Sequence, residues 1–206
     1  MIMTIVRHGL TQGNVEGRWV GSTDMPLSDK GLQQALNGSR NESIRRVYVT
    51  PLRRTQETAA ILYPNAEQVI VPGIREMGFG IFEGKGHDEL RDDPVFIQWN
   101  ANGGMDPMPD GEGRRDFGLR VMRALDELVR AAISAGEESL HILAHGGTIM
   151  ALMAAFGIPK KPYHEWWVDN LCGYCVRIDE ETWAEEPRFY DVEPISFCPV
   201  EALTEQ

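Results

Sequence analysis

Two apolar stretches of the sequence each end in a histidine followed by glycine. Residues 2–6 lead into Arg7-His8-Gly9, and residues 140–144 lead into residues 145–148, His-Gly-Gly-Thr. Short apolar runs of this kind indicate buried strands, and neighbouring parallel strands place their carboxyl ends at the ligand site of an α/β sheet. If the two strands are neighbours, His8 and His145 face each other across one pocket. A helix beginning at the second pair of glycines would add free N–H groups, so the chemistry predicted for this point is anion binding.

A third strand end adds two arginines. The predicted strand 46–49 is followed by Thr50-Pro51-Leu52-Arg53-Arg54. We expect Thr50 to cap a helix whose first position is Pro51 and which ends near residue 62, so that both arginines lie in its first turn. Taken singly, a core histidine is usually only hydrogen-bonded, and such an arginine is usually solvated. Together the three strand ends predict an anion pocket of two histidines and two arginines, because the guanidinium fork stays charged and matches phosphate.

The elements that must position these groups alternate between strand and helix. Alternation of this kind implies a three-layer α/β/α fold with a mostly parallel central sheet, here as a single domain over residues 1–206. The periodicity predicts strands at 1–6, 46–49, 69–71, 140–144 and about 189–192, and helices at 28–40, 52–62, 115–135 and 148–156, with Ser28 as the cap of the first helix.

Residues 84–113 break this alternation. Residues 87–99 have a helical pattern, but the remainder is rich in glycine, asparagine and proline. A turn-rich segment inside a compact domain is more often a lid or a binding loop than a linker. We therefore expect a lid-like insertion that sets substrate specificity, with an apolar wall built from Phe96, Trp99, Met105 and Met108.

The composition excludes several classes of protein. The chain has 206 residues, 42% hydrophobic and 25% charged, with a formal net charge of −11. The acidic balance argues against a nucleic-acid partner, and no run is long enough for a signal peptide or a membrane span. We therefore expect a cytoplasmic protein without membrane or nucleic-acid partners. A small anionic substrate is still compatible with this charge, because salt screens the distant surface over about 8 Å.

The cysteines offer a weaker alternative function. Cys172 and Cys175 have the spacing of a redox or zinc motif. However, residues 174–178 read as a strand, on which positions three apart point to opposite faces. The sequence also lacks the second cysteine pair or histidine pair that a tetrahedral zinc site requires. We interpret both cysteines as small apolar packing residues, which leaves a redox or zinc module as the weaker reading.

Five segments together resemble the histidine phosphatase superfamily, the phosphoglycerate-mutase-like group. Arg7-His8-Gly9 with Thr11 and Asn14 is similar to the family's opening motif, Arg-His-Gly-x-Thr-x-x-Asn. The other similar segments, in order along the chain, are residues 21–28, 50–59, 75–80 with Glu83-Gly84, and 145–148. Two departures are mild: Thr50 stands for the usual serine, and Gly113 stands where a serine would follow Gly111-Glu112.

The resemblance implies a phosphoryl-transfer site without metal or other cofactor. His8 would be the nucleophile that forms a phosphohistidine, and it must be neutral for this role. Arg7 and Arg54, rather than Arg53, would grip phosphate oxygens. His145, expected to be protonated, would add a donor for the transition state. Glu76 would protonate the leaving group and then deprotonate the attacking water.

A second group of residues is expected to contact the phosphate or the rim of the substrate. These residues are Asn14, Gly21, Ser22, Gly146 and Gly147. The expected substrate is a small phosphorylated metabolite. A homodimer is compatible with the sequence, which does not determine the oligomeric state.

The resemblance leaves three activities open. A phosphatase, similar to broad-specificity or α-ribazole phosphatases, is favoured over a phosphoglycerate mutase. The chain lacks the mutases' Glu-Arg-x-Tyr-Gly sequence and has Gly13 where they carry tryptophan before the asparagine. A non-catalytic phosphate-binding scaffold is the third reading, but such proteins usually lose a pocket residue.

Overall fold

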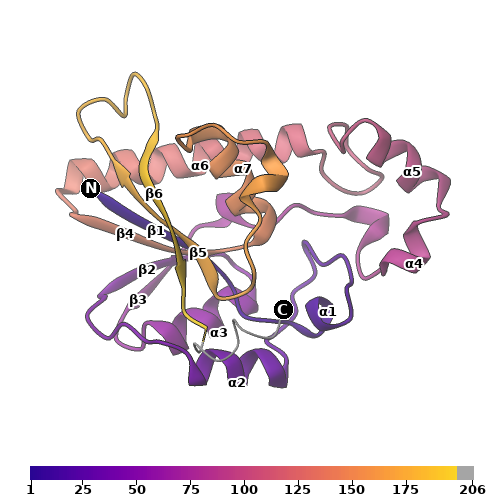
Figure 1. Cartoon of the computed structure of the whole chain (residues 1–206), viewed down its shortest axis with the longest axis horizontal. Helices are drawn as coiled ribbons and strands as arrows, with labels where there is room; N and C mark the ends of the chain where they lie inside the picture. The colour runs from indigo at the N-terminus through magenta and orange to yellow at the C-terminus, as the bar shows by residue number, and fades with distance from the viewer. Residues whose placement is uncertain (199–206) are drawn as a thin grey trace.

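The computed structural model describes residues 1–198 and shows a six-stranded sheet with helices on both faces (Figure 1). The strand order is β3-β2-β4-β1-β5-β6. The four strands from β3 to β1 are parallel, whereas β5 is antiparallel to β1 and to β6. The predicted mostly parallel α/β fold is therefore confirmed. The strands are β1 (Ile2–Arg7), β2 (Arg46–Val49), β3 (Glu67–Ile70), β4 (Ser139–Ala144), β5 (Cys172–Ile178) and β6 (Phe189–Ser196).

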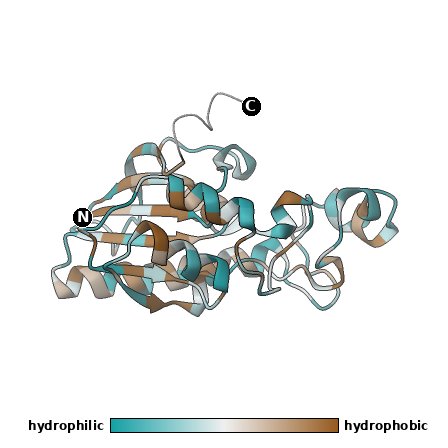
Figure 2. Ribbon diagram, turned by 90° about the horizontal axis from the view of Figure 1, so that it is seen from below, coloured by the Kyte–Doolittle hydropathy of each residue, from teal (hydrophilic) through white to brown (hydrophobic). Residues whose placement is uncertain are grey.

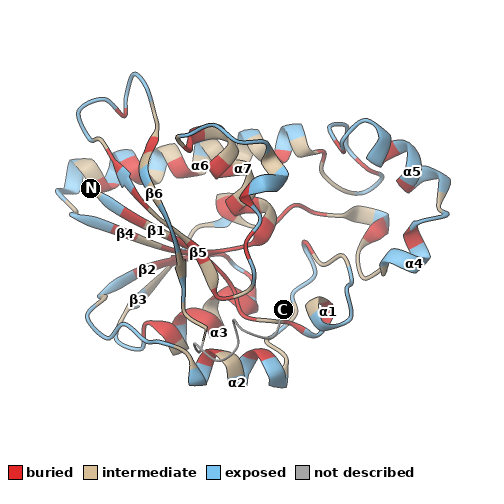
Figure 3. Cartoon of the chain, in the orientation of Figure 1, coloured by how far each residue is buried: buried red, intermediate tan, exposed pale blue. Residues whose placement is uncertain are grey.

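The helices divide between the two faces of the sheet. Helices α6 (Arg114–Ala135) and α7 (Gly146–Phe156) cover one face, and α2 (Asp29–Asn37) and α3 (Arg53–Leu62) cover the other (Figure 1). Apolar strand side chains feed a large core under α6 and α7 and a smaller one under α2 and α3. Hydrophobic residues accordingly lie on the strands of the sheet (Figure 2), and the inner strands β1, β2 and β4 are buried along most of their length (Figure 3). The remaining helices are α1 (Gln12–Val15), α4 (His87–Leu90), α5 (Pro94–Ala101), and the 3₁₀ helices η1 (Pro72–Ile74), η2 (Gly80–Phe82) and η3 (Tyr163–Trp166).

The start of α3 differs from the prediction. Its N-cap is Leu52, which has no side-chain cap, and its first helical residue is Arg53. The predicted cap at Thr50 with Pro51 at the first position was wrong. The Thr50 hydroxyl instead lies 2.9 Å from the Thr55 hydroxyl and 3.1 Å from His145 Nε2. Since the hydroxyl already has these partners, it does not cap the helix. Ser28 caps α2 as predicted, accepting from the backbone N–H of Gly31 at 3.1 Å.

Residues 84–113 lie beyond the sheet and carry α4 and α5 (Figure 1). The predicted helix 87–99 is interrupted because Asp93 caps a new helix at Pro94, its carboxylate accepting from the N–H groups of Val95 and Phe96. Of the apolar residues expected to form a wall, Phe96, Trp99 and Met108 are buried but Met105 is 48% exposed. The role of this segment as a lid remains a prediction.

The cysteines lie along the sheet rather than around a metal. Cys172 and Cys175 both belong to β5, and each is a half-buried free thiol. The expected strand is therefore confirmed, although neither side chain is fully buried. Among residues 1–198, no three His, Cys, Asp or Glu side chains are grouped so as to hold a metal ion. None of the described helices has the length and apolar content needed to cross a membrane.

Candidate active site

The two histidine-bearing strand ends are neighbours. β1 and β4 pair in parallel, with Arg7 opposite Ala144, and the backbone N–H of His8 donates to the carbonyl of Ala144 at 3.0 Å. The chain leaves both strands at the same edge of the sheet, so the rings of His8 and His145 lie 5.2 Å apart, edge to face. The predicted juxtaposition of the two strand ends is confirmed.

The ring of His8 is fixed through one nitrogen. Its Nδ1 lies 2.7 Å from the carbonyl oxygen of Gly9, which can only accept, so Nδ1 carries the proton in the neutral ring. Nε2 then holds the lone pair, and no group within residues 1–198 hydrogen-bonds it. Burial, followed by the charges of Arg54 and Arg7, lowers the pKa of His8 well below its usual value. His8 is therefore a neutral imidazole with a free nitrogen.

Arg7 has a guanidinium with unused donors. Its NH1 donates to the carbonyl of Val168 at 2.8 Å, and its guanidinium carbon lies 4.5 Å from the ring centre of Trp167. Its Nε is buried and has no partner. A buried N–H without a partner costs about 1–3 kcal/mol, so a bound anion would recover a hydrogen bond that the protein alone does not make.

Arg54, by contrast, has partners on all sides. It is 1% exposed and donates to the carbonyls of Gly21 at 2.7 Å and Thr23 at 2.8 Å, and from Nε to Nδ1 of His145 at 3.3 Å. Arg53 is exposed and pairs with Glu57 at 2.9 Å. The helix thus directs Arg54 inward and Arg53 outward, but Arg54 is not among the residues that line the cavity, so the contact of Arg54 with phosphate oxygens stays a prediction.

His145 has a different protonation state from the predicted one. Its Nδ1 accepts from the permanently charged Arg54, so this nitrogen holds a lone pair, and the proton lies on Nε2 toward the Thr50 hydroxyl. Burial, then Arg54 and His8, lower the pKa of His145 well below its usual value. The expectation of a protonated His145 is therefore wrong for the structure described: the loss of water, together with Arg54, His8, Arg7 and Arg120, favours the neutral ring.

Glu76 lies beside the beginning of α7. Its Oε1 accepts from the backbone N–H of Met77 and its Oε2 from that of Gly147, each at 2.9 Å. Burial raises the pKa of Glu76, although the two N–H groups and the arginines oppose the shift. A β-carbon at position 147 would overlap with the carboxylate, so only glycine permits this approach. The result is a buried carboxyl group of raised pKa at the same pocket as His8.

A second carboxylate holds the backbone around Glu76. The carboxylate of Glu112 forms ion pairs with the guanidinium groups of Arg120, at 2.7 Å, and of Arg75, at 3.1 Å. Arg120 also donates to the carbonyls of Gly73 at 2.9 Å and Glu76 at 3.3 Å. This network ties the chain before Glu76 to α6.

Gly21 and Ser22 lie behind the pocket. Their backbone N–H groups and the Ser22 hydroxyl donate to the carboxylate of Glu83, at 2.8–3.1 Å, as does the Thr23 hydroxyl at 2.7 Å. The N–H of Phe79 adds a further bond at 3.0 Å. Glu83 thus fixes the loop whose carbonyls receive Arg54. The structure places Gly21 and Ser22 in this support rather than on the wall of the cavity.

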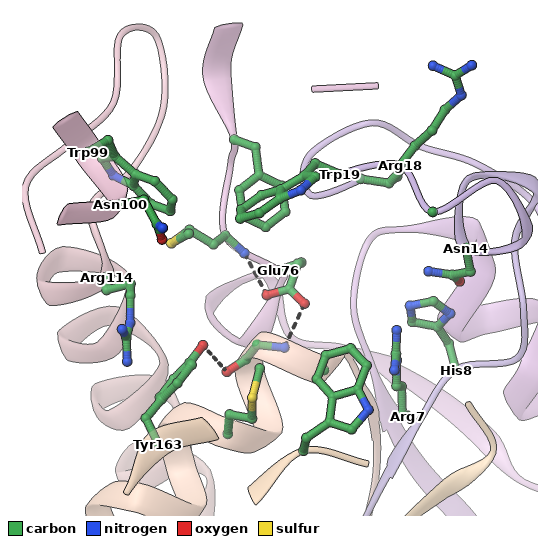
Figure 4. Close-up of a pocket in the computed structure, with 18 of the residues that line it drawn as sticks. Arg7, His8, Asn14, Arg18, Trp19, Glu76, Trp99, Asn100, Arg114 and Tyr163 are labelled. Atoms are coloured by element: carbon green, nitrogen blue, oxygen red, sulfur yellow. Dashed lines mark hydrogen bonds between the residues drawn. The ribbon is translucent and has the colours of Figure 1, made fainter. Parts of the chain in front are cut away.

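The cavity in front of His8 has a volume of about 420 Å³ (Figure 4). Asn14, Gly146 and Gly147 line it as expected, and Arg7 and Glu76 project into it. The Asn14 side chain also accepts from the N–H of Thr11 at 3.0 Å, so one of its roles is to cap α1.

Several lining residues were not singled out from the sequence. Arg18, Trp19, Arg114, Tyr163 and Trp167 all line the cavity. They come from segments that lie apart in the sequence and outside the five similar motifs, so only the folded chain identifies them. The local signals were the adjacent arginine and tryptophan at 18–19 and the two adjacent arginines at 114–115.

The chain was compared with known proteins. The model of the histidine phosphatase superfamily (branch 1) matches residues 3–187. The chain belongs to this superfamily. A probable phosphoglycerate mutase GpmB of Enterobacter sp. (strain 638) is 33% identical over 187 residues, covering 87% of this chain and 86% of that protein. A homologue with the same description from Yersinia pestis (strain Pestoides F) is 32% identical over 189 residues, with the same two coverages.

Solved structures of the superfamily share the fold. The α-ribazole phosphatase from Shigella flexneri is 28% identical, with a TM-score of 0.73 over 87% of this chain and 91% of that one. A putative α-ribazole-5′-P phosphatase from Escherichia coli, 24% identical, has a TM-score of 0.76 over 97% of this chain and 96% of that one, which speaks for the fold alone. This histidine phosphatase superfamily member therefore resembles proteins described as phosphatases and others described as mutases.

Proposed function

We propose that the protein is a phosphomonoesterase that hydrolyses a small phosphorylated metabolite through a phosphohistidine on His8. The observation that carries the proposal is the pairing, at one cavity, of a neutral His8 whose Nε2 is free with a buried Glu76 whose pKa is raised. The first is the form that a nucleophile needs, and the second shift favours the protonated form that a general acid needs.

The first half-reaction transfers the phosphoryl group to the enzyme. Nε2 of His8 attacks phosphorus, the ester P–O bond breaks, and the proton of Glu76 goes to the leaving oxygen. Arg7, which lines the cavity, contributes guanidinium donors to the phosphoryl oxygens. The positive end of α7, which begins at Gly146, adds to this field.

The second half-reaction releases phosphate. Glu76, now a carboxylate, takes a proton from water, and the water oxygen forms a bond to phosphorus as the N–P bond breaks. His8 regains its lone pair and inorganic phosphate leaves. Arg54 and His145 lie next to the cavity rather than on its wall. Hydrogen bonds to the carbonyls of Gly21 and Thr23 keep the positive charge of Arg54 close to the phosphoryl group. Neutral His145 keeps Arg54 in place by accepting from its Nε at Nδ1.

A phosphoglycerate mutase is the second candidate, because relatives described as probable mutases are 32–33% identical over most of the chain. It would use the same phosphohistidine but return the group to a different oxygen. Against it, residues 75–80 are Arg-Glu-Met-Gly-Phe-Gly and position 13 is glycine, unlike the mutase pattern.

Phosphorus NMR separates the two activities. The wild-type protein is incubated with 3-phosphoglycerate and, separately, with p-nitrophenyl phosphate in the presence of a chelator, since the proposal needs no metal. Phosphate release from either substrate is expected. Interconversion of 2- and 3-phosphoglycerate without release would favour the mutase.

The intermediate is tested with His8→Ala. Rapid acid-free quenching of the wild-type reaction should trap a phosphoenzyme that is stable in base and labile in acid. His8→Ala should lose both this species and turnover. The matched control is His87→Ala, which changes an exposed histidine outside the cavity and should retain both. A phosphoenzyme in His8→Ala would contradict the proposal.

A further inference from the structure

Arg114 lies on the opposite side of the cavity from Arg7 and His8, with Glu76 between them (Figure 4). It is the first residue of α6. Its guanidinium carbon lies 3.9 Å from the ring centre of Tyr163, and its NH1 donates to the carbonyl of Gly103 at 2.7 Å. The stacking and this hydrogen bond fix the direction of the side chain before any ligand arrives.

The charge of Arg114 is not neutralised by the protein. Within residues 1–198, no carboxylate lies in ion-pair distance of its guanidinium, and the Gly103 carbonyl is its one hydrogen-bond acceptor. Arg18, which lines the same cavity, differs in this respect: it pairs with Glu16 at 2.6 Å and Glu89 at 3.2 Å. A guanidinium group has five N–H donors, so most of those of Arg114 remain for a ligand.

The wall between the two ends of the cavity is aromatic and rigid. Trp19 packs edge to face against Phe79, with ring centres 4.9 Å apart, and against Trp99 at 5.9 Å. These three rings and Tyr163 line the cavity. Flat apolar groups pack well against such rings. The cavity thus offers an anion site at His8 and Arg7, an aromatic middle, and a second cation at Arg114.

We propose that Arg114 binds a second anionic oxygen group of the substrate, and that this substrate is a phosphomonoester with a planar apolar middle and an anionic group at its far end. This inference rests on the proposed phosphomonoesterase function. The neighbouring Arg115 provides a matched control, because it has the same charge and is next in sequence but is exposed and does not line the cavity.

The test uses two esters of nearly equal leaving-group acidity, 4-carboxybenzyl phosphate and 4-carbamoylbenzyl phosphate, which differ by one negative charge. The measured quantity is the ratio of their kcat/KM values. Wild type and Arg115→Gln should prefer the carboxylate by about tenfold, the size of one charge-assisted hydrogen bond. Arg114→Gln should bring the ratio close to one, mainly through KM, and Arg114→Lys should restore part of it. The wild-type preference should also decline as salt is added.

A second measurement separates this inference from the proposed function. The non-hydrolysable 4-carboxybenzylphosphonate and its carboxamide analogue are titrated into wild type and Arg114→Gln, with the fluorescence of the cavity tryptophans as the signal. If no ester is hydrolysed but the carboxylate analogue binds more tightly only when Arg114 is present, the proposed function fails and the subsite stands. If esters are hydrolysed but wild type shows no preference in rate or binding, the subsite fails and the function stands. A preference that survives in Arg114→Gln would also overturn the assignment.

Discussion

The two ends of the cavity are built in different ways. At the strand ends, His8, His145, Arg54 and Glu76 are at most 7% exposed, and their side chains have fixed backbone or side-chain partners. On the far side, Arg114 has a single carbonyl partner and lies in a wall of partly exposed residues. Trp167, above Arg7, is 54% exposed.

We infer from this difference that the buried end of the cavity carries out the chemistry and that the outer wall selects the substrate. Burial and hydrogen bonds to fixed partners set the protonation states and the direction of each reacting group, which phosphoryl transfer requires. The outer wall fixes only shape and charge. Substitutions at the strand ends should therefore affect turnover, and those at the outer wall should affect mainly the selection of substrate.

The strongest effect is expected at the acid. Glu76→Gln keeps the size of the side chain but removes its proton, so benzyl phosphate hydrolysis should fall by about 10²–10⁴-fold. p-Nitrophenyl phosphate should lose far less in the phosphoryl-transfer step, because nitrophenolate leaves without a proton. Single-turnover kinetics on both esters measures the difference. An equal loss for both would assign Glu76 another role.

A residue outside the cavity should have the next largest effect. In Glu83→Gln, one carboxylate oxygen becomes an NH₂ group facing N–H donors, so the loop 21–23 loses acceptors and Arg54 loses fixed carbonyls. We expect a loss of about 1–3 kcal/mol of unfolding free energy in urea and about a tenfold loss of kcat. Glu185→Gln, at an exposed position, should change neither. If Glu83→Gln keeps the wild-type kcat, the proposal that Glu83 positions Arg54 through loop 21–23 is wrong.

The buried His8 should contribute to the pH dependence of stability. The pKa of His8 in the native protein lies below its value in the unfolded chain. Below about pH 6.5 the unfolded chain therefore takes up a proton that the native protein does not, and the free energy of unfolding decreases as the pH is lowered. The raised pKa of Glu76 acts in the opposite sense, with stability lost as pH rises above its unfolded value. His8→Asn removes only the first contribution, so the slope of unfolding free energy between pH 5.5 and 6.5 should decrease by up to about 1.4 kcal/mol per pH unit. Urea titrations of wild type and His8→Asn at several pH values in this range measure the two slopes, and an unchanged slope would contradict a lowered pKa of His8.

The smallest effect is expected at the exposed tryptophan. Trp167→Leu removes the ring stacked on Arg7, a contact worth about 0.5–1 kcal/mol at an exposed position. The inhibition constant for inorganic phosphate should rise by about two- to fivefold, with kcat close to that of wild type. Trp167→Phe should recover part of the affinity. A large loss of kcat would show that Trp167 also supports the chemistry through Arg7, the residue that it contacts at the phosphate end of the cavity.

Much of the fold could be predicted because its signals are local. Apolar periodicity gave the parallel strands and the main helices, and the glycine-flanked histidines indicated which strand ends meet. Element boundaries were less accurate where a side chain had a distant partner. Thr50 has a favourable sequence for a cap, but its hydroxyl faces His145, 95 positions away, and α3 begins at Arg53 instead.

Some features of the site could likewise be predicted from local sequence, whereas others depend on the tertiary structure. The sequence by itself determined the types and order of four groups, His8, Arg54, Glu76 and His145, because each lies within a short motif that the family resemblance identifies. Only the tertiary structure decided that His145 is neutral, that Glu83 supports Arg54, and that Arg114 faces the cavity. The physical reason is that burial, pKa and an uncompensated charge depend on neighbours brought together from distant parts of the chain, and no local pattern records them.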